Sequence, residues 1–149
     1  LLSLDPLETK DARILLHGHL HAHNLERFSN FSISHGLAVL LGITLDAMLD
    51  HPPQAPIVDK LVEILRQPVF STQIKLVTGF LSTPANLQDL KAVYEAEARV
   101  QFLNGFDRYS VISVPTIGCY GTQPLPLIMK DTKWESIHEA ITQLKQRLV

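Results

Sequence analysis

The sequence predicts a mainly α (α+β) fold: a helical domain of about five to six helices with a short C-terminal β-hairpin-like segment and a terminal amphipathic helix. Three observations support this fold class. Residues 33–49 are apolar on nearly every side of a helix, and further segments carry apolar residues at helical spacing. Residues 109–114 alternate and are rich in β-formers, residues 118–123 have the composition of a turn, and residues 125–130 could form a second strand. The length of 149 residues predicts one globular domain, 1–149, with a possible change of subdomain near residue 105.

Residues 33–49, with the sequence ISHGLAVLLGITLDAML, form the predicted central helix. The segment has no polar stripe at a period of 3.6, which is typical of a helix buried in the interior. Polar side chains interrupt the apolar run, so it is too short for a membrane span, which needs roughly 18 consecutive apolar residues. A proline pair, Pro52 and Pro53, ends the pattern. A buried strand over residues 37–45 is the alternative, and the length of the pattern favours the helix.

The N-terminal region carries a helix-start signature in Asp5, Pro6 and Glu8. These residues supply a capping acceptor, a proline at the first helical position and an acid three residues after the cap. They predict a helix from Pro6 to about Arg27. The sequence HGHLHAH in the same region alternates with a period of two, so a strand is the alternative there. The absence of bounding proline or glycine clusters favours the helix.

Three more helices are predicted between the proline pair and residue 105. The first begins at Pro56, carries a buried stripe with the spacing i, i+3, i+4, i+7, and ends before Pro68. Residues 69–81 fit either a helix or a strand, and their helical neighbours favour a helix. The last helix begins at Pro84 and runs to about Leu103, before an Asn-Gly stop.

The C-terminal part combines two predicted strands, residues 109–114 and 125–130, with a final helix. Prolines confine these strands to edges, because proline has no N–H for a sheet ladder. Thr132 and Glu135 predict a capping box at the start of the helix. The apolar stripe of this helix consists of Trp134, Ile137, Ile141, Leu144 and Leu148. We expect the stripe to dock on the domain's own core or, if that core is already closed, to form a dimer surface.

The composition excludes several classes of function. The chain has 13 Lys and Arg against 15 Asp and Glu and no basic cluster, so no nucleic-acid partner is expected. The single cysteine excludes an internal disulfide and favours a cytoplasmic location. The chain begins at Leu1, which leaves open a preceding targeting segment. Cys119 in TIGCYGT does not match the spacing of a nucleophile elbow, so we expect an inert thiol.

Four of the seven histidines lie within seven positions: His17, His19, His21 and His23. On a strand all four would point to one side, where neighbours could share a transition metal such as Zn, Fe, Ni or Cu. On a helix the first and third form one i, i+4 pair and the second and fourth form another on nearly the opposite side. In that case each pair would need a further ligand, for which the candidates are His35, His51, Asp46 and Asp50. The alternative to a metal site is a set of partly exposed or hydrogen-bonded imidazoles on an amphipathic helix.

The favoured function from the sequence is a non-catalytic protein-interaction or self-association module, whose partner is another protein or a second copy. Its candidate contact surfaces are the apolar stripe of the terminal helix and the prolines within residues 114–126. The alternative is a transition-metal-binding protein or a metal-dependent hydrolase that uses the histidine row. A His-x-His after an apolar run resembles the first metal-binding strand of amidohydrolase-type barrels, although such a barrel needs roughly 200 residues. A sensor of a small apolar ligand is a third possibility. No catalytic residue is assigned.

Overall fold

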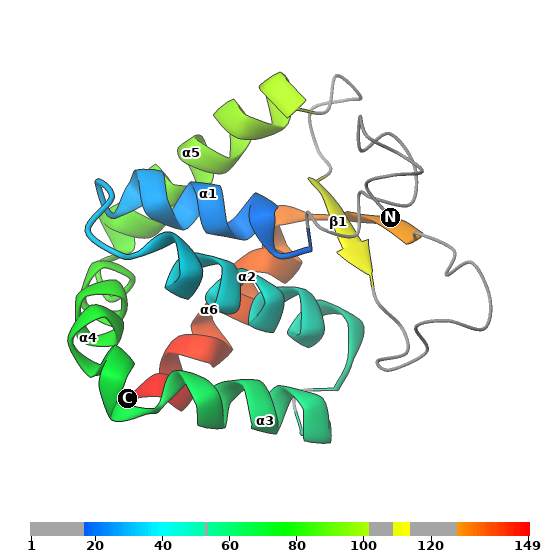
Figure 1. Ribbon diagram of the computed structural model, residues 1–149. Helices are drawn as coiled ribbons and strands as arrows, with labels where there is room; N and C mark the ends of the chain where they lie inside the picture. The colour runs from blue at the N-terminus through cyan, green and yellow to red at the C-terminus, as the bar shows by residue number, and fades with distance from the viewer. Residues whose placement is uncertain (1–16, 53, 102–108, 114–127) are drawn as a thin grey trace, which may run out of the picture.

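The computed structural model describes residues 17–52, 54–101, 109–113 and 128–149 (Figure 1). These residues are mostly helical, as predicted. The helices are α1 (His19–Phe28), α2 (His35–Asp50), α3 (Pro56–Leu65), the short 3-10 helix η2 (Pro68–Phe70), α4 (Ser71–Phe80), α5 (Pro84–Gln101) and α6 (Trp134–Leu148). The strands are β1 (Tyr109–Ser113) and β2 (Ile128–Thr132). Within the described ranges, no helix has the length and apolar character needed to cross a membrane.

Helix α2 is the centre of the fold, which confirms the predicted buried helix. It contacts α1, α3, α6 and β1, and Figure 1 shows it running between α1 and α3. Leu37, Leu41 and Leu45 are each buried to 1% exposure. A helix that other elements surround in this way has no need of a polar face, which explains the apolar pattern of the sequence.

Helix α1 begins at His19, so the expected continuous helix from Pro6 to Arg27 is wrong at residues 17 and 18. Gly18 has a left-handed φ of 77°, which breaks the helical path directly before α1. The reason is tertiary, because a Cβ built on Gly42 of α2 would lie only 2.8 Å from the carbonyl carbon of Gly18. The two backbones therefore meet where neither residue has a side chain. Residues 1–16, including the helix-start signature, lie outside the described residues.

The connection from α1 to α2 is a tight turn with two unusual residues. Asn30 and Phe31 have positive φ angles of 51° and 56°, which are uncommon for residues with a side chain. The N–H of Phe31 donates to the carbonyl of Glu26, 2.7 Å away. The turn reverses the chain over a few residues, and it brings the last turn of α1 next to His35 at the start of α2.

The predicted helices between the proline pair and residue 101 are confirmed. Helix α3 buries Val58, Val62 and Leu65 of its stripe. The ambiguous residues 69–81 are helical: they fold into η2 and α4, and α4 buries Ile74 and Val77. Helix α5 begins at Pro84 as expected. Its predicted end at Leu103 falls outside the described residues.

The two strands pair in an antiparallel ladder that places Tyr109 opposite Thr132 and Ser113 opposite Ile128. The second strand lies closer to α6 than the sequence indicated. Residues 114–127 between the strands, with Cys119, lie outside the described residues, so the predicted hairpin as a whole is not seen.

Helix α6 packs against α2, α3 and α4, and Figure 1 shows it behind α2. The members of its apolar stripe are buried or partly buried in the core: Trp134, Ile137, Ile141, Leu144 and Leu148. This is the first of the two arrangements expected for this helix. The predicted capping box does not form. Lys133 occupies the N-cap position without a side-chain cap, and Thr132 is instead the last residue of β2.

Candidate active site

Helix α1 divides the histidine row into two groups, as the helical alternative expected. His21 is fully buried against the rest of the domain, whereas His19 and His23 are only partly buried. Side chains two positions apart on a helix point to nearly opposite sides. His17 precedes the helix and lies with His21 near the same carboxylate. The four imidazoles therefore do not share one site.

The outer cluster consists of His19, His23 and His35, the last from the start of α2. The ring centres of His19 and His23 are 5.6 Å apart, as are those of His19 and His35. The ring centres of His23 and His35 are 6.2 Å apart. The side chain of His35 is 57% exposed. Two helices thus place three imidazoles together, with His35 the most exposed of the three.

Hydrogen bonds orient two rings of the outer cluster. His35 Nδ1 lies 3.0 Å from Glu26 Oε1, and His19 Nδ1 lies 3.3 Å from the carbonyl oxygen of His17. Both partners are acceptors, so each favours the neutral tautomer that carries its proton on Nδ1. The lone pair is then on Nε2, which can accept a proton or bind a metal ion.

The outer cluster partly fits a metal ion. Three imidazoles bound to one ion place their ring centres roughly 5–6 Å apart, since each metal–nitrogen distance is about 2.0–2.1 Å. The ring centres of the outer cluster have about this spacing. However, in the part of the chain that the structure describes, no group of three or more His, Cys, Asp or Glu side chains is arranged to hold an ion. The three rings would have to turn toward a common point to bind one ion. His51, which the sequence offered as a further ligand, lies at the opposite end of α2 from His35.

The inner network consists of His17, His21, Asp46 and Tyr94. Asp46 on α2 is 3% exposed, and its Oδ2 accepts the Gly18 N–H at 2.8 Å. The same Oδ2 lies 3.4 Å from His17 Nε2, and Oδ1 lies 3.0 Å from His21 Nε2. On the other side of the ring, His21 Nδ1 is 2.7 Å from Tyr94 Oη. A buried carboxylate is therefore surrounded by groups from both ends of the first turn of α1.

Burial sets the protonation of the network. Burial raises the pKa of Tyr94 well above 10, and Asp46 and Tyr109 act in the same direction. Tyr94 therefore keeps its proton. The Asp46 carboxylate beside His21 Nε2 favours the tautomer with its proton on that nitrogen, so His21 Nδ1 accepts a hydrogen bond from the Tyr94 hydroxyl. His21 Nε2 and Asp46 Oδ1 make no hydrogen bond of good geometry, although they are 3.0 Å apart. We treat this contact as electrostatic. Burial also lowers the pKa of His17, against the opposing influence of Asp46 and Asp50.

Sequence reasoning identified His35 and Asp46 as possible partners of the two histidine pairs, but it missed Glu26 and Tyr94. Tyr94 lies 73 residues from His21 along the chain, so only the fold brings them together. Glu26 lies three positions after His23, and its role depends on the turn that returns the chain to His35. One of the two glycines of residues 33–49, Gly42, was a sequence signal for the close approach of α1 and α2.

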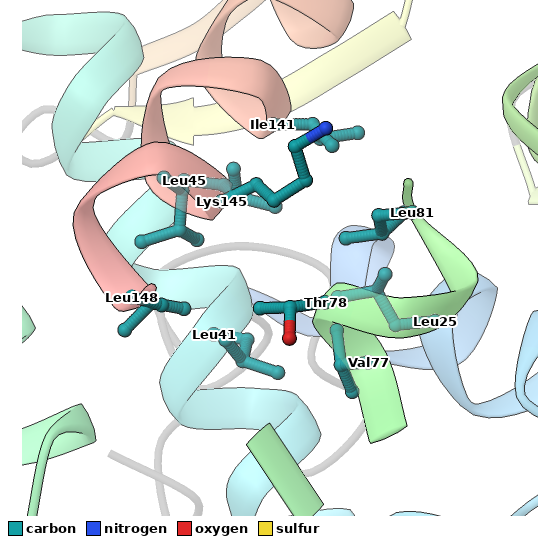
Figure 2. Close-up of a pocket in the computed structure, with 10 residues that line it drawn as sticks. Leu25, Leu41, Leu45, Val77, Thr78, Leu81, Ile141, Lys145 and Leu148 are labelled. Atoms are coloured by element: carbon teal, nitrogen blue, oxygen red, sulfur yellow. The ribbon is translucent and has the colours of Figure 1, made fainter. Parts of the chain in front are cut away.

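A small cavity between α1, α2, α4 and α6 does not offer a second site. Figure 2 shows side chains from these four helices around it, including Leu25, Leu41 and Val77, with Lys145 at its edge. Its volume is about 10 Å³ and its walls are apolar. A space of this size holds a single water at most, and an apolar one of this kind usually stays dry.

Comparison with known proteins places the histidine groups within a family. The family model "3-dehydroquinate synthase C-terminal" matches residues 1–93. The match includes α1 to α4 and the first half of α5, so it covers the outer cluster and Asp46, while the strands and α6 lie beyond it. Neither the comparison with curated proteins nor that with solved structures gives a match.

The family match corrects the function inferred from the sequence. A synthase is an enzyme, so the match indicates a catalytic role rather than a non-catalytic interaction or self-association module. It also contradicts the alternative of a metal-dependent hydrolase, because a synthase forms its product by a reaction other than hydrolysis. The sequence shows no recognisable catalytic motif, and the absence of such a motif does not exclude an enzyme.

Proposed function

The chain belongs to the 3-dehydroquinate synthase C-terminal family, and we propose that it provides part of the active site of an enzyme that forms 3-dehydroquinate. We further propose that the outer cluster, His19, His23 and His35, contacts the substrate. The observation that carries the proposal is the convergence of three partly exposed imidazoles from α1 and α2 within the matched residues.

Imidazoles suit the chemistry that the family name denotes. 3-Dehydroquinate is a carboxylated ring with hydroxyl groups and a ketone, so its formation requires protons to move to and from oxygen and carbon. A neutral imidazole with a free Nε2 accepts a proton near neutral pH, and its protonated form returns it. The Nδ1 contacts of His19 and His35 leave their Nε2 atoms in that state.

A divalent transition metal such as Zn, Fe, Ni or Cu is a second element of the proposal. The residues that would hold it are His19, His23 and His35. The spacing of the ring centres supports this arrangement. When bound, such an ion supplies a Lewis acid that polarises a carbonyl or hydroxyl oxygen.

Glu26 has a positioning role in this proposal. Its carboxylate is largely buried and holds Nδ1 of the exposed His35 at 3.0 Å. A carboxylate in this position fixes the tautomer and the orientation of the ring, and loss of such a partner typically lowers activity or metal affinity by about 10–100-fold.

A cytoplasmic location remains a prediction from the sequence.

The test is the rate of 3-dehydroquinate formation by the intact natural protein with His19→Ala, His23→Ala or His35→Ala. We expect kcat/KM to fall by at least about 10²-fold in each variant, the lower range for loss of an acid–base group. His51→Ala is the matched control, because it removes a histidine at the opposite end of α2. Wild-type activity in all three cluster variants would contradict the proposal.

Metal analysis is a separate arm of the same test. The natural protein, purified without a histidine tag, should contain near-stoichiometric metal, and the double variant His19→Ala, His23→Ala should lose it. If both proteins lack metal while the cluster variants are inactive, the imidazoles act on the substrate directly, and the metal is dropped from the proposal.

A further inference from the structure

The start of α1 lacks a cap of its own. Gly18 at the N-cap position has no side chain, no side-chain cap forms, and the first turn contains no acidic residue. The N-terminus of a helix has unpaired N–H groups and a partial positive charge, both of which favour a nearby carboxylate. Asp46 of α2 provides that carboxylate from another element, through its 2.8 Å bond to the Gly18 N–H.

The same carboxylate also contacts two side chains that flank this turn. Its two oxygens lie near His17 Nε2 and His21 Nε2. A buried carboxylate is costly unless charges or hydrogen bonds surround it. Asp46 therefore contacts the start of α1 at three points: the backbone before the helix, the side chain that precedes it, and a side chain in its first turn.

Tyr94 of α5 completes the arrangement from the opposite side of the His21 ring. It donates to His21 Nδ1 at 2.7 Å, and both residues are fully buried. The ring of His21 is thus held between a hydroxyl on α5 and a carboxylate on α2. Such a ring has little freedom to turn, and the backbone that carries it is restricted in the same way.

This restraint acts directly on the outer cluster. His19 and His23 lie two positions before and after His21 on the same helix, so any rotation or shift of α1 moves both rings relative to His35. A displacement of about 1 Å in an active-site group can lower a rate on the order of 10²-fold. We propose that Asp46 is a positioning residue, which acts through Gly18, His17 and His21 to set the geometry of the outer cluster; the inference rests on the proposed function.

The decisive variant is Asp46→Asn, which keeps the size of the side chain. Asparagine can still accept the Gly18 N–H, but its NH₂ group then faces the Nε2–H of His21, so two donors meet. We expect kcat for 3-dehydroquinate formation to fall between about 10-fold and 10²-fold, with KM changed by less than about 2-fold, because the rings remain present but are misplaced. Asp46→Glu should not restore kcat, since a longer carboxylate cannot occupy the same position.

Thr44→Val is the matched control. Thr44 lies on α2, is as buried as Asp46, and its hydroxyl donates to the carbonyl of Leu40 within the same helix. Thr44→Val should lower the stability of α2 without changing the contacts to α1, so kcat should remain at the wild-type value. A fall in kcat of equal size in Thr44→Val and Asp46→Asn would reduce the effect to general destabilisation and overturn the proposal.

A spectroscopic measurement separates this proposal from the proposed function. Long-range ¹H–¹⁵N spectra of the imidazoles report ring environment without any turnover. In Asp46→Asn we expect the signals of His19 and His23 to shift, and in Thr44→Val we expect them unchanged. Unchanged His19 and His23 signals together with wild-type kcat in folded Asp46→Asn would overturn the positioning role.

Tyr94→Phe provides the test if Asp46→Asn does not fold. It removes only the hydroxyl that holds His21 Nδ1, and we expect a several-fold fall in kcat with the same pattern of imidazole shifts. Wild-type kcat and spectra in this variant would then overturn the proposal.

If the outer-cluster variants are active, the proposed function fails. If they are inactive while Asp46→Asn is fully active, only the positioning role fails.

Discussion

The inner and outer faces of α1 carry the same side chain in opposite environments. His21 is fully buried between Asp46 and Tyr94, whereas His19 and His23 lie partly exposed beside His35. The faces alternate every two residues, because a helix turns by about 200° over that distance. The comparison shows that a row of identical residues does not define one site. The environment of each ring determines whether it stabilises the fold or is available for chemistry.

The two faces also differ in what their loss should affect. A buried polar network is costly to disrupt, because the remaining groups lose their partners in a medium of low dielectric. A solvated imidazole leaves no such gap when it is removed. We therefore expect loss of the inner histidine to reduce mainly stability, with an indirect effect on activity through the position of α1, and loss of the outer ones to reduce mainly activity.

The largest expected effect is on activity. The double variant His19→Ala, His23→Ala should lower kcat/KM by about 10²–10⁴-fold, because it removes two of the three imidazoles available for proton transfer. Its free energy of unfolding should change by less than about 1 kcal/mol, since both side chains are partly exposed. Steady-state kinetics and urea denaturation of the same sample give both values. A large loss of stability with little loss of activity would reverse the assignment of the faces.

The next effect is the reverse of the first. His21→Ala should lower the free energy of unfolding by about 3 kcal/mol, because it leaves the carboxylate of Asp46 and the hydroxyl of Tyr94 buried with fewer partners. Urea denaturation measures the change, with His23→Ala as the control on the same helix. Equal stability of the two variants would show that the buried position contributes nothing specific.

A smaller effect should follow from the contact between the two helices. Gly42→Ala places a methyl group against the backbone of Gly18, which cannot move aside as a side chain can. We expect a loss of about 2 kcal/mol from this overpacking. Gly36→Ala on the same helix meets nothing within 4 Å and serves as the control. Thermal melts that rank the two variants in the opposite order would contradict the close approach of α1 and α2.

The smallest effect concerns Tyr94 and depends on pH. Tyr94→Phe should cost about 1 kcal/mol at neutral pH through the lost hydrogen bond to His21. The pKa of Tyr94 is raised in the folded state, so above a pH of about 10 the unfolded chain loses a proton that the folded chain keeps. The stability of the wild type should therefore fall as the pH rises past that point, and the variant should show a shallower fall. Identical alkaline slopes in urea denaturation would show that Tyr94 is not protected.

Much of the fold followed from local pattern. The apolar run of α2 and the proline-bounded stripes of α3 and α5 were predicted, because burial and helix-start chemistry leave a direct mark on the sequence. The start of α1 was not predicted, because the left-handed conformation of Gly18 depends on a contact with Gly42, which lies 24 positions further along the chain. The prediction of a capping box at Thr132 was wrong for a similar reason, because Thr132 pairs with Tyr109 as the last residue of β2.

The candidate site was predicted only in part. Helical geometry was sufficient to separate His17 and His21 from His19 and His23 and to name His35 and Asp46 as potential partners. It could not reveal Tyr94, which reaches His21 from a helix far along the chain. Nor could it reveal the enzymatic role, since single imidazoles on a helix carry no signature of a reaction.

Tyr94 joins two parts of the molecule that the family match separates. It directly follows the matched residues, contacts His21 within them, and stacks edge-on with Tyr109 and Trp134 beyond them. The C-terminal segment is therefore more than a cover for the apolar core. Tyr94 links this segment to His21 of α1, so we expect substitutions at Tyr109 or Trp134 to affect the position of α1 and its histidines.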